Sequence, residues 1–362
     1  MGVIVTIIGT RPEIIKMAPV VEAFDALDHD HVLAHSGQHY DLVMDGVFFE
    51  DLKLREPDHR FELKDQPPHL QIATTMRQIA GVTESADLVV VHGDTNTTVA
   101  GALLANKQSR RLAHVEAGIR SFDRTMPEEV NRIVADQLSD LLFSPTETSR
   151  ENLRRENVTR GVHVVGNSVI DALMRHLPLA EKRSDALDRL DLEPGDYLLL
   201  TFHRAENVDR PETLSRALDA FEAVAKETGR TILFPMHPRT REALKRQALD
   251  ARARSIAGLR IVEPVGYLDM LVLLKNAALV MTDSGGLQEE GCFLHIPCVT
   301  LRENTERPET LDIGSNVLAG TDPKRIVAAV KRMVDAKREW PNPYGDGTTA
   351  KKVARIVDAS LG

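Results

Sequence analysis

Short apolar runs rich in β-branched residues recur along the chain, and amphipathic stretches of helical length separate most of them. The runs form two successive series: 3–8, 31–35, 88–92, 112–115 and 162–165, then 197–202, 231–235, 259–262, 279–281 and 298–301. Strands that alternate with helices predict parallel sheets covered by helices. We therefore expect an α/β protein with two Rossmann-like, doubly wound domains that face each other across a cleft.

The chain of 362 residues is long enough for two domains with separate cores. We expect a first domain over residues 1–170 and a second over residues 171–345, with the polar stretch 181–196 as the seam. The turn-rich segment WPNPYGDG at 340–347 precedes a last amphipathic stretch. We expect residues 346–362 to form a helix that packs back on the first domain.

Composition and charge exclude several classes of protein. The net charge of −9 argues against nucleic acid as a partner, because a phosphate backbone requires a basic surface. The two cysteines, Cys292 and Cys298, lack the spacing of a zinc site or a disulfide framework, so no metal is expected. No apolar run is long enough to cross a membrane, and no leader precedes the first strand, which predicts a cytoplasmic protein.

Two nucleotide-binding fingerprints are missing from the sequence. No Gly-x-Gly-x-x-Gly follows an apolar run, which argues against nicotinamide or flavin chemistry. No Gly-Lys-Ser/Thr is present, which argues against a P-loop enzyme. We therefore expect no cofactor.

Charged residues follow the strands of the first series. Arg11 and Lys16 lie in the first turns of a helix after the first strand, and Asp94 and Glu116 follow two later strands. A loop with Arg120 and Arg124 leads to Glu128 at the next helix start. Ligands of open parallel sheets bind outside the carboxyl ends of the strands. Acids and cations that converge there predict proton chemistry beside an anion.

A purely structural interpretation of the acids stays open. The segments 10–13, 125–128 and 209–212 each place a capping residue, a proline in the first turn and a glutamate in third position. In a capping box such a glutamate binds the backbone at the helix start and needs no catalytic role. Glu128 fits both interpretations, and Asp94 also fits as an N-cap.

The second series carries a different set of residues at its strand ends. His203 and His237 follow two strands of the series, and a third strand leads to Thr282-Asp283-Ser284-Gly285-Gly286. Backbone amides exposed at a helix start suit a diphosphate. Glu290, about two turns into that helix, suits ribose hydroxyls. These features predict a nucleoside diphosphate on the second domain, opposite the acids of the first.

The motifs closely resemble those of the non-hydrolysing UDP-N-acetylglucosamine 2-epimerases. They are GTRPEIIKMAPV, GQH, VHGDTNTT, HVEAGIRSFDRTMPEEVNR, SPTETSRENL, GNSVIDAL, HRAEN, TDSGGLQEE and ENTERPE. The resemblance implies a glycosyltransferase-B-like fold and a homodimer. It also implies that the chain interconverts UDP-N-acetylglucosamine and UDP-N-acetylmannosamine through 2-acetamidoglucal, for surface polysaccharide synthesis.

The resemblance also implies roles for individual residues. The positions matching the family's catalytic set are Asp94, Glu116, Glu128 and His203. The positions matching its UDP-binding set are Arg11, Lys16, His237, Ser284, Gly285, Gly286, Glu290 and Arg307. Gln38 matches part of a site for a second, activating UDP-N-acetylglucosamine, whereas Asp41 and Gln66 replace a glutamine and an arginine common there.

Several alternatives remain at this point. The loop 121–126 is shorter than in many bacterial members and resembles that of relatives acting on UDP-2,3-diacetamido-2,3-dideoxyglucuronate. A glycosyltransferase of the same fold, a hydrolysing epimerase and a catalytically silent UDP-sugar-binding protein also fit the residues.

Overall fold

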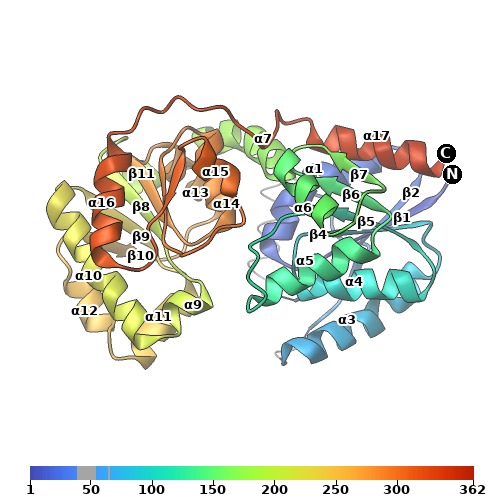
Figure 1. Cartoon of the computed structure of the whole chain (residues 1–362), viewed down its shortest axis with the longest axis horizontal. Coiled ribbons are helices and arrows are strands. Elements are labelled where there is room, and N and C mark those ends of the chain that lie inside the picture. The colour runs from blue at the N-terminus through green and yellow to red at the C-terminus, as the bar shows by residue number, and fades with distance from the viewer. Residues whose placement is uncertain (39–53, 64–65) are drawn as a thin grey trace. The chain divides into compact units, whose positions relative to one another are not determined.

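The computed structural model describes residues 1–38, 54–63 and 66–362, and the chain divides into two compact units (Figure 1). Unit 1 comprises Met1–Met174 and Pro343–Gly362, and unit 2 comprises Arg175–Asn342. The chain leaves unit 1 within the helix Ser168–Arg183 (α7), and the polar stretch 181–196, expected to be the seam, lies inside unit 2. Each unit contains a parallel sheet flanked by helices, as the sequence predicted.

Unit 1 contains a seven-stranded sheet in the order β3-β2-β1-β4-β5-β6-β7, with every neighbouring pair parallel. The strands are β1 (Val3–Ile8), β2 (Asp30–His35), β3 (His59–Arg60), β4 (Leu88–His92), β5 (Arg111–Val115), β6 (Leu141–Ser144) and β7 (Val162–Val164). The strand order reverses between β1 and β4. This topological switch point is where ligands of doubly wound sheets bind.

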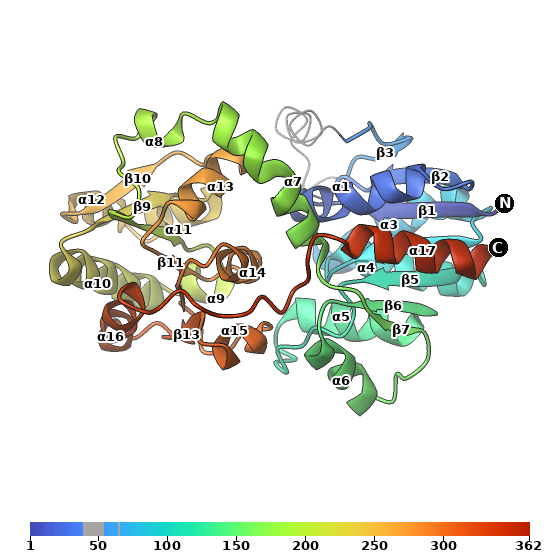
Figure 2. The same cartoon turned by 90° about the horizontal axis from the view of Figure 1, so that it is seen from above.

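Helices cover both faces of this sheet. The C-terminal helix α17 (Thr349–Leu361) lies along α1 (Arg11–Asp25), as Figure 2 shows. On the other face α4 (Asn96–Lys107) packs between α3 (Pro68–Thr83) and α5 (Pro127–Leu138). The remaining helix wholly within the described part of unit 1 is α6 (Glu147–Arg155). None of the helices described is long and apolar enough to cross a membrane.

Unit 2 contains a six-stranded parallel sheet in the order β10-β9-β8-β11-β12-β13. The strands are β8 (Tyr197–Thr201), β9 (Thr231–Pro235), β10 (Leu259–Val262), β11 (Leu279–Thr282), β12 (Cys298–Thr300) and β13 (Asn316–Leu318). The helices are α8 (Ala186–Arg189), α9 (Ala205–Val208), α10 (Pro211–Thr228), α11 (Pro238–Arg246), α12 (Asp250–Ser255), α13 (Tyr267–Lys275), α14 (Gly285–Phe293), α15 (Pro308–Asp312) and α16 (Pro323–Val334). Here the order reverses between β8 and β11.

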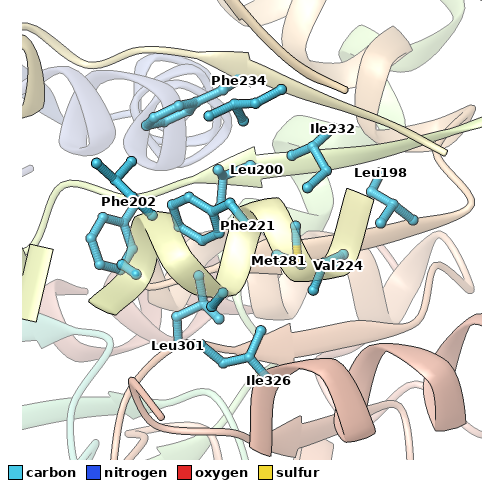
Figure 3. Packing of buried hydrophobic residues seen from close by; sticks show 14 of the residues in the cluster. Leu198, Leu200, Phe202, Phe221, Val224, Ile232, Phe234, Met281, Leu301 and Ile326 are labelled. Atoms are coloured by element: carbon cyan, nitrogen blue, oxygen red, sulfur yellow. The ribbon is translucent and has the colours of Figure 1, made fainter. Parts of the chain in front are cut away.

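A buried aromatic cluster fixes the strand ends of unit 2 (Figure 3). The ring of Phe221 on α10 meets that of Phe202 edge-on, with 5.6 Å between the ring centroids, and that of Phe234 at 6.5 Å. Phe202 directly precedes His203, and Phe234 lies on β9 shortly before His237. The core therefore anchors the backbone from which both histidines emerge.

Candidate active site

Glu116 directly follows β5 and is nearly buried. Its Oε1 accepts hydrogen bonds from Lys16 Nζ at 2.6 Å and from Asn167 Nδ2 at 2.8 Å, while its Oε2 lies 3.4 Å from His92 Nε2. Its φ of 72° falls in the left-handed region, which non-glycine residues adopt rarely and mostly at turns or functional sites. An ammonium and an amide donor on one oxygen stabilise the charged carboxylate.

His92, the last residue of β4, contributes a neutral ring beside Glu116. Burial lowers the pKa of His92 to about 4, against the opposing charge of Glu116. Neither ring nitrogen has a hydrogen-bond partner among the described residues. Among the contacts described, Glu116 therefore has the cation of Lys16 and the amide of Asn167 at Oε1 and the imidazole of His92 beside Oε2.

Asp94 follows the neighbouring strand β4, and its Oδ2 lies 2.5 Å from Nη1 of Arg132. Arg132 is buried on α5 and also binds Glu129 at 2.9 Å. The N-cap of α4 is Thr95, whose hydroxyl accepts from the N–H of Thr98, so the interpretation of Asp94 as an N-cap is wrong. Asp94 therefore presents a partly exposed carboxylate after β4, the strand that pairs with β5, which Glu116 follows.

Glu128 is the second residue of α5, and its capping-box interpretation is wrong. The N-cap is Met126, because Thr125 uses its hydroxyl in a 2.6 Å hydrogen bond to Asp123. The third helical position belongs to Glu129, whose carboxylate accepts from the N–H groups of Ser121 at 2.8 Å and Phe122 at 2.9 Å. Glu129, not Glu128, thus holds the loop that leads into the helix.

Of the other two expected capping boxes, one is present and one is not. Thr10 and Glu13 form the box at the start of α1, which confirms that prediction. In segment 209–212 the N-cap is Arg210, so Glu212 is second in α10 and the expected box is wrong. Asp209 instead pairs with Arg239 at 2.6 Å, which removes it from the capping position.

Arg120 does not lie beside an anion site, contrary to the sequence-based prediction. Its guanidinium is fully buried and pairs with Asp136 and Glu156, each at 2.7 Å. Burial opposes the charge of Arg120, but these two carboxylates raise its pKa. Arg120 therefore stabilises the loop after β5 from within, while Arg124 lies exposed on the same loop.

The two cations of α1 have different surroundings. Arg11 is the first helical residue and is partly buried, whereas Lys16 makes the ion pair with Glu116. Gln38 lies in the turn after β2, where its Oε1 accepts from the N–H and the hydroxyl of Thr97 at 2.9 and 2.8 Å. Asp41 lies outside the described residues, and Gln66 Oε1 accepts from Thr74 at 3.5 Å.

Glu13 gives a testable pH dependence. Its Oε2 accepts from the N–H groups of Gly9 and Thr10 at 2.7 and 2.8 Å, yet burial raises its pKa from 4.5 to about 7. The folded state then binds more protons than the unfolded state between these values, so stability falls as pH rises through this window. Replacing Glu13 with glutamine removes that slope.

We expect the free energy of unfolding of Glu13→Gln, relative to that of the wild type, to increase by about 3 kcal/mol between pH 4.5 and pH 7, because only the wild type loses stability over this range. Urea unfolding of both proteins across this range measures the difference. The opposite slope from His92 is present in both proteins and cancels. A difference that does not change with pH contradicts the prediction.

In unit 2 the two predicted histidines lie together. The ring centroids of His203 and His237 are 5.2 Å apart. Asp283, buried after β11, accepts from the N–H groups of His203 and Arg204 at 2.8 Å each, and its Oδ1 lies 3.1 Å from His203 Nδ1. Burial raises the pKa of Asp283, but the contacts with His203 and the hydrogen bonds from Arg204 and Asn207 together lower it. Asp283 thus orients His203 across the switch point.

The start of α14 forms an amide cluster beside a cation. Ser284 is the N-cap, and its side chain makes no capping hydrogen bond. A Cβ on Gly285 would lie 3.8 Å from Arg307 Cζ, so the guanidinium lies close to the first helical turn. Arg307 is held in turn by the buried carboxylate of Glu289. N–H groups, a helix dipole and a guanidinium at one place suit a phosphate group.

Glu290 lies nearly buried on the same helix. Burial, together with the charge of Glu290, raises the pKa of Tyr267 on α13. The Tyr267 hydroxyl is buried and has no hydrogen-bond partner in the part of the chain that the structure describes. Glu290 is thus largely shielded from solvent and lies close enough to the buried phenol of Tyr267 for its charge to act on it.

The structure therefore places the predicted residues in two groups. In unit 1, Lys16, Asp94 and Glu116 gather at the ends of β4 and β5. In unit 2, His203 lies beside His237, and the Ser284–Gly286 turn lies beside Arg307. No group of three or more potential metal ligands occurs among the residues described.

Sequence reasoning missed three residues that hold these groups: Asn167, Arg132 and Asp283. Each is buried and binds a candidate residue from another element. Asn167 and Asp283 lie within the GNS and TDSGG motifs, which was the available signal.

Comparison with known proteins identifies the family. The family model described as UDP-N-acetylglucosamine 2-epimerase matches residues 22–358. The chain belongs to this family. It is 45% identical to the UDP-N-acetylglucosamine 2-epimerase of Methanococcus maripaludis over 356 residues, 97% of each chain.

Two further relatives support the assignment to this 2-epimerase family, one by structure and one by sequence. The crystal structure of the Methanocaldococcus jannaschii UDP-GlcNAc 2-epimerase in complex with UDP-GlcNAc and UDP superposes with a TM-score of 0.94 at 43% identity, covering 99% of this chain and 100% of that one. The UDP-2,3-diacetamido-2,3-dideoxy-D-glucuronate 2-epimerase of Pseudomonas aeruginosa is 36% identical over 98% of this chain and 99% of its own. The glycosyltransferase-B-like fold class and the epimerase class predicted from the sequence are confirmed.

Proposed function

We propose that this protein interconverts UDP-N-acetylglucosamine and UDP-N-acetylmannosamine through 2-acetamidoglucal. In the first half-reaction a proton leaves carbon 2 and the bond from carbon 1 to the diphosphate oxygen breaks, which leaves a double bond between the two carbons. In the second, a proton reaches the opposite face of carbon 2 and the diphosphate oxygen bonds to carbon 1 again. The reaction needs acid/base groups and electrostatic stabilisation of the leaving diphosphate. It is redox-neutral and needs no oxidant or reductant.

The observation that carries the proposal is the group of carboxylates at neighbouring strand ends in a chain of this family. Asp94 follows β4 and Glu116 follows β5, each beside a cation, and Glu128 opens α5. We assign these three carboxylates and His203 as acid/base and transition-state-stabilising groups. Their contacts support the assignment, because each of the first two is held by a buried or nearly buried partner.

We assign UDP binding mainly to unit 2. The N–H groups at Ser284, Gly285 and Gly286 and the guanidinium of Arg307 would bind the diphosphate. His237, whose ring lies beside that of His203, belongs to the same proposed set. The Methanocaldococcus structure, which contains UDP-GlcNAc and UDP, supports a UDP-sugar substrate. Arg11 and Lys16 of unit 1 and Glu290 complete the proposed set.

Other implications of the family resemblance stay predictions. They are the homodimer, the cytoplasmic location, the role in polysaccharide synthesis and the activating site at Gln38. At Gln38 the side chain is bound to Thr97 at the start of α4, so an activator there would have to contact or displace that amide.

Proton NMR of the enzyme with UDP-N-acetylglucosamine in deuterated water tests the function. We expect the signals of UDP-N-acetylmannosamine to appear and the proton on carbon 2 to be replaced by deuterium in both sugars. Free N-acetylmannosamine with UDP would indicate a hydrolysing epimerase instead. Turnover only after addition of an acceptor would indicate a glycosyltransferase, and UDP binding without turnover would indicate a binding protein.

A second candidate is 2-epimerisation of UDP-2,3-diacetamido-2,3-dideoxyglucuronate. The short loop 121–126 and the relative in Pseudomonas aeruginosa favour it. Comparison of kcat/KM for the two UDP-sugars decides between the candidates, because specificity is the ratio of these constants.

Replacing Glu290 with alanine tests the nucleotide assignment. We expect UDP affinity to fall by about 1–3 kcal/mol, because a nearly buried carboxylate loses its hydrogen bonds to hydroxyl groups of the ligand. Isothermal titration calorimetry with UDP measures the change. Glu222→Ala removes an exposed carboxylate from α10 in the same unit and serves as the control. Equal UDP affinity in the Glu290 variant and the wild type would exclude this role.

A further inference from the structure

The side chain of Asn167 connects Glu116 to the start of α7. Its Nδ2 donates to Glu116 Oε1 at 2.8 Å, and its Oδ1 accepts from the N–H of Val169 at 3.1 Å. The residue is only 1% exposed, so water does not compete for these bonds. Because one end of the amide must donate and the other must accept, the orientation of the amide is determined.

The backbone of Asn167 is fixed as firmly as its side chain. Its N–H donates to the carbonyl of Tyr344 at 2.8 Å. The neighbouring glycines, Gly166 with φ of 97° and Gly345 with φ of 105°, approach so closely that a Cβ on Gly166 would lie 3.3 Å from Gly345 Cα. Neither position accommodates a side chain without strain.

Both connections between the units are therefore attached to unit 1 at Asn167. The first connection is α7, which Asn167 caps and which enters unit 2 after Met174. The second returns to unit 1 at Pro343, next to the Tyr344 carbonyl that Asn167 binds. Glu116 thus receives one of the hydrogen bonds described for its carboxylate from the residue that anchors both connections.

We propose that Asn167 is a positioning residue for Glu116. Lys16 and Asn167 share Oε1, and their separate directions fix the plane of the carboxylate, with Oε2 toward His92. Lys16 alone, on a flexible stem, would leave that plane undetermined. The role rests on the proposed function of Glu116 as an acid/base group, for which orientation decides the rate of proton transfer.

The test compares two substitutions that keep the helix cap. Asn167→Ser and Asn167→Asp both retain a good N-cap for α7 but lose the N–H donor to Glu116. We expect kcat for UDP-N-acetylglucosamine to fall roughly 10- to 100-fold, more for the aspartate, which adds a negative charge beside Glu116. KM should stay near the wild-type value in both variants, and the melting temperature should stay near it in Asn167→Ser. Asn167→Asp should also lower the melting temperature, because two buried carboxylates then repel each other. If Asn167 only caps the helix, both variants keep the wild-type kcat, and the proposal is overturned.

A control variant distinguishes loss of the Glu116 orientation from a general destabilisation of the segments that join the two units. Asp171 binds the N–H of Ala350 at 2.9 Å at the start of α17 and is not among the candidate site residues. Asp171→Ala should lower the melting temperature and leave kcat unchanged. An equal loss of kcat in Asp171→Ala and Asn167→Ser would assign the effect to the connection and overturn the proposal.

A second measurement does not depend on activity. Crystal structures of the wild type and of Asn167→Ser should show the Glu116 carboxylate in one orientation in the former and rotated or in several orientations in the latter. An unchanged carboxylate in the variant overturns the proposal. If the wild type does not convert UDP-N-acetylglucosamine, the proposed function fails, and these crystal structures still decide the role of Asn167.

Discussion

Replacing Glu116 with glutamine is expected to lower turnover roughly 10²- to 10⁴-fold, the range for loss of a proton-transfer group. Glutamine keeps an acceptor for Asn167 but carries no charge and takes up no proton at neutral pH. The ammonium of Lys16, only 12% exposed, then lacks its counter-charge, so we also expect a loss of stability of about 1–3 kcal/mol. Deuterium incorporation at carbon 2 and urea unfolding on one preparation measure both effects.

A second ion pair in unit 1 provides the control for lost stability. Glu156 binds the buried guanidinium of Arg120 at 2.7 Å and contacts none of the candidate site residues in the described bonds. Glu156→Gln should lower stability without lowering turnover. A Glu116→Gln enzyme that exchanges deuterium at the wild-type rate would exclude an acid/base role for this residue.

The sequence predicted most of the buried, apolar strands, but it missed β6 (Leu141–Ser144), a four-residue strand that is buried along its whole length inside the sheet of unit 1. Runs such as Val3–Ile8 and Leu88–His92 are strands with the expected bounds. The strands β3 (His59–Arg60) and β13 (Asn316–Leu318) were missed because each is two or three residues long and lies at a sheet edge. An edge strand pairs on one side only and needs no apolar run to identify it.

The helix starts show why a local sequence pattern could not determine whether a glutamate forms a capping box. Segments 10–13 and 125–128 share the same spacing, yet only the first forms a capping box. In the second, Asp123 binds the hydroxyl and the N–H of Thr125, and the helix begins one residue later. A competing side-chain contact two residues upstream was enough to move Glu128 out of the capping position.

The motifs contain the residues that hold the candidate site, but the contacts of these residues could not be predicted, because their partners are distant in sequence. Asn167 binds Glu116 across 51 positions, and Asp283 binds His203 across 80. Arg120 is the opposite case. Its place in a charged loop suggested that it binds an anionic ligand, whereas the carboxylates of Asp136 and Glu156 hold it inside the fold. The carboxyl ends of the strands indicate where the site lies, but tertiary contacts determine which side chains take part in it.

Glu128 is expected to combine a small effect on stability with a large effect on turnover. As the second residue of α5 its charge interacts with the helix dipole, so Glu128→Gln should cost about 0.3–1 kcal/mol. If Glu128 transfers a proton at carbon 2, turnover should fall roughly 10²- to 10⁴-fold. Melting temperature and deuterium exchange at carbon 2, measured on the same preparation, give both values.

Glu212 is a matched control for this prediction. It is also the second residue of its helix, α10, and directly follows a proline at the first position. Glu212→Gln therefore removes the same charge from the same place relative to a helix dipole, and we expect the same small loss of stability with full turnover. If Glu128→Gln and Glu212→Gln behave alike in both measurements, Glu128 acts only at its helix start, and Asp94 and Glu116 remain as the carboxylates for proton transfer.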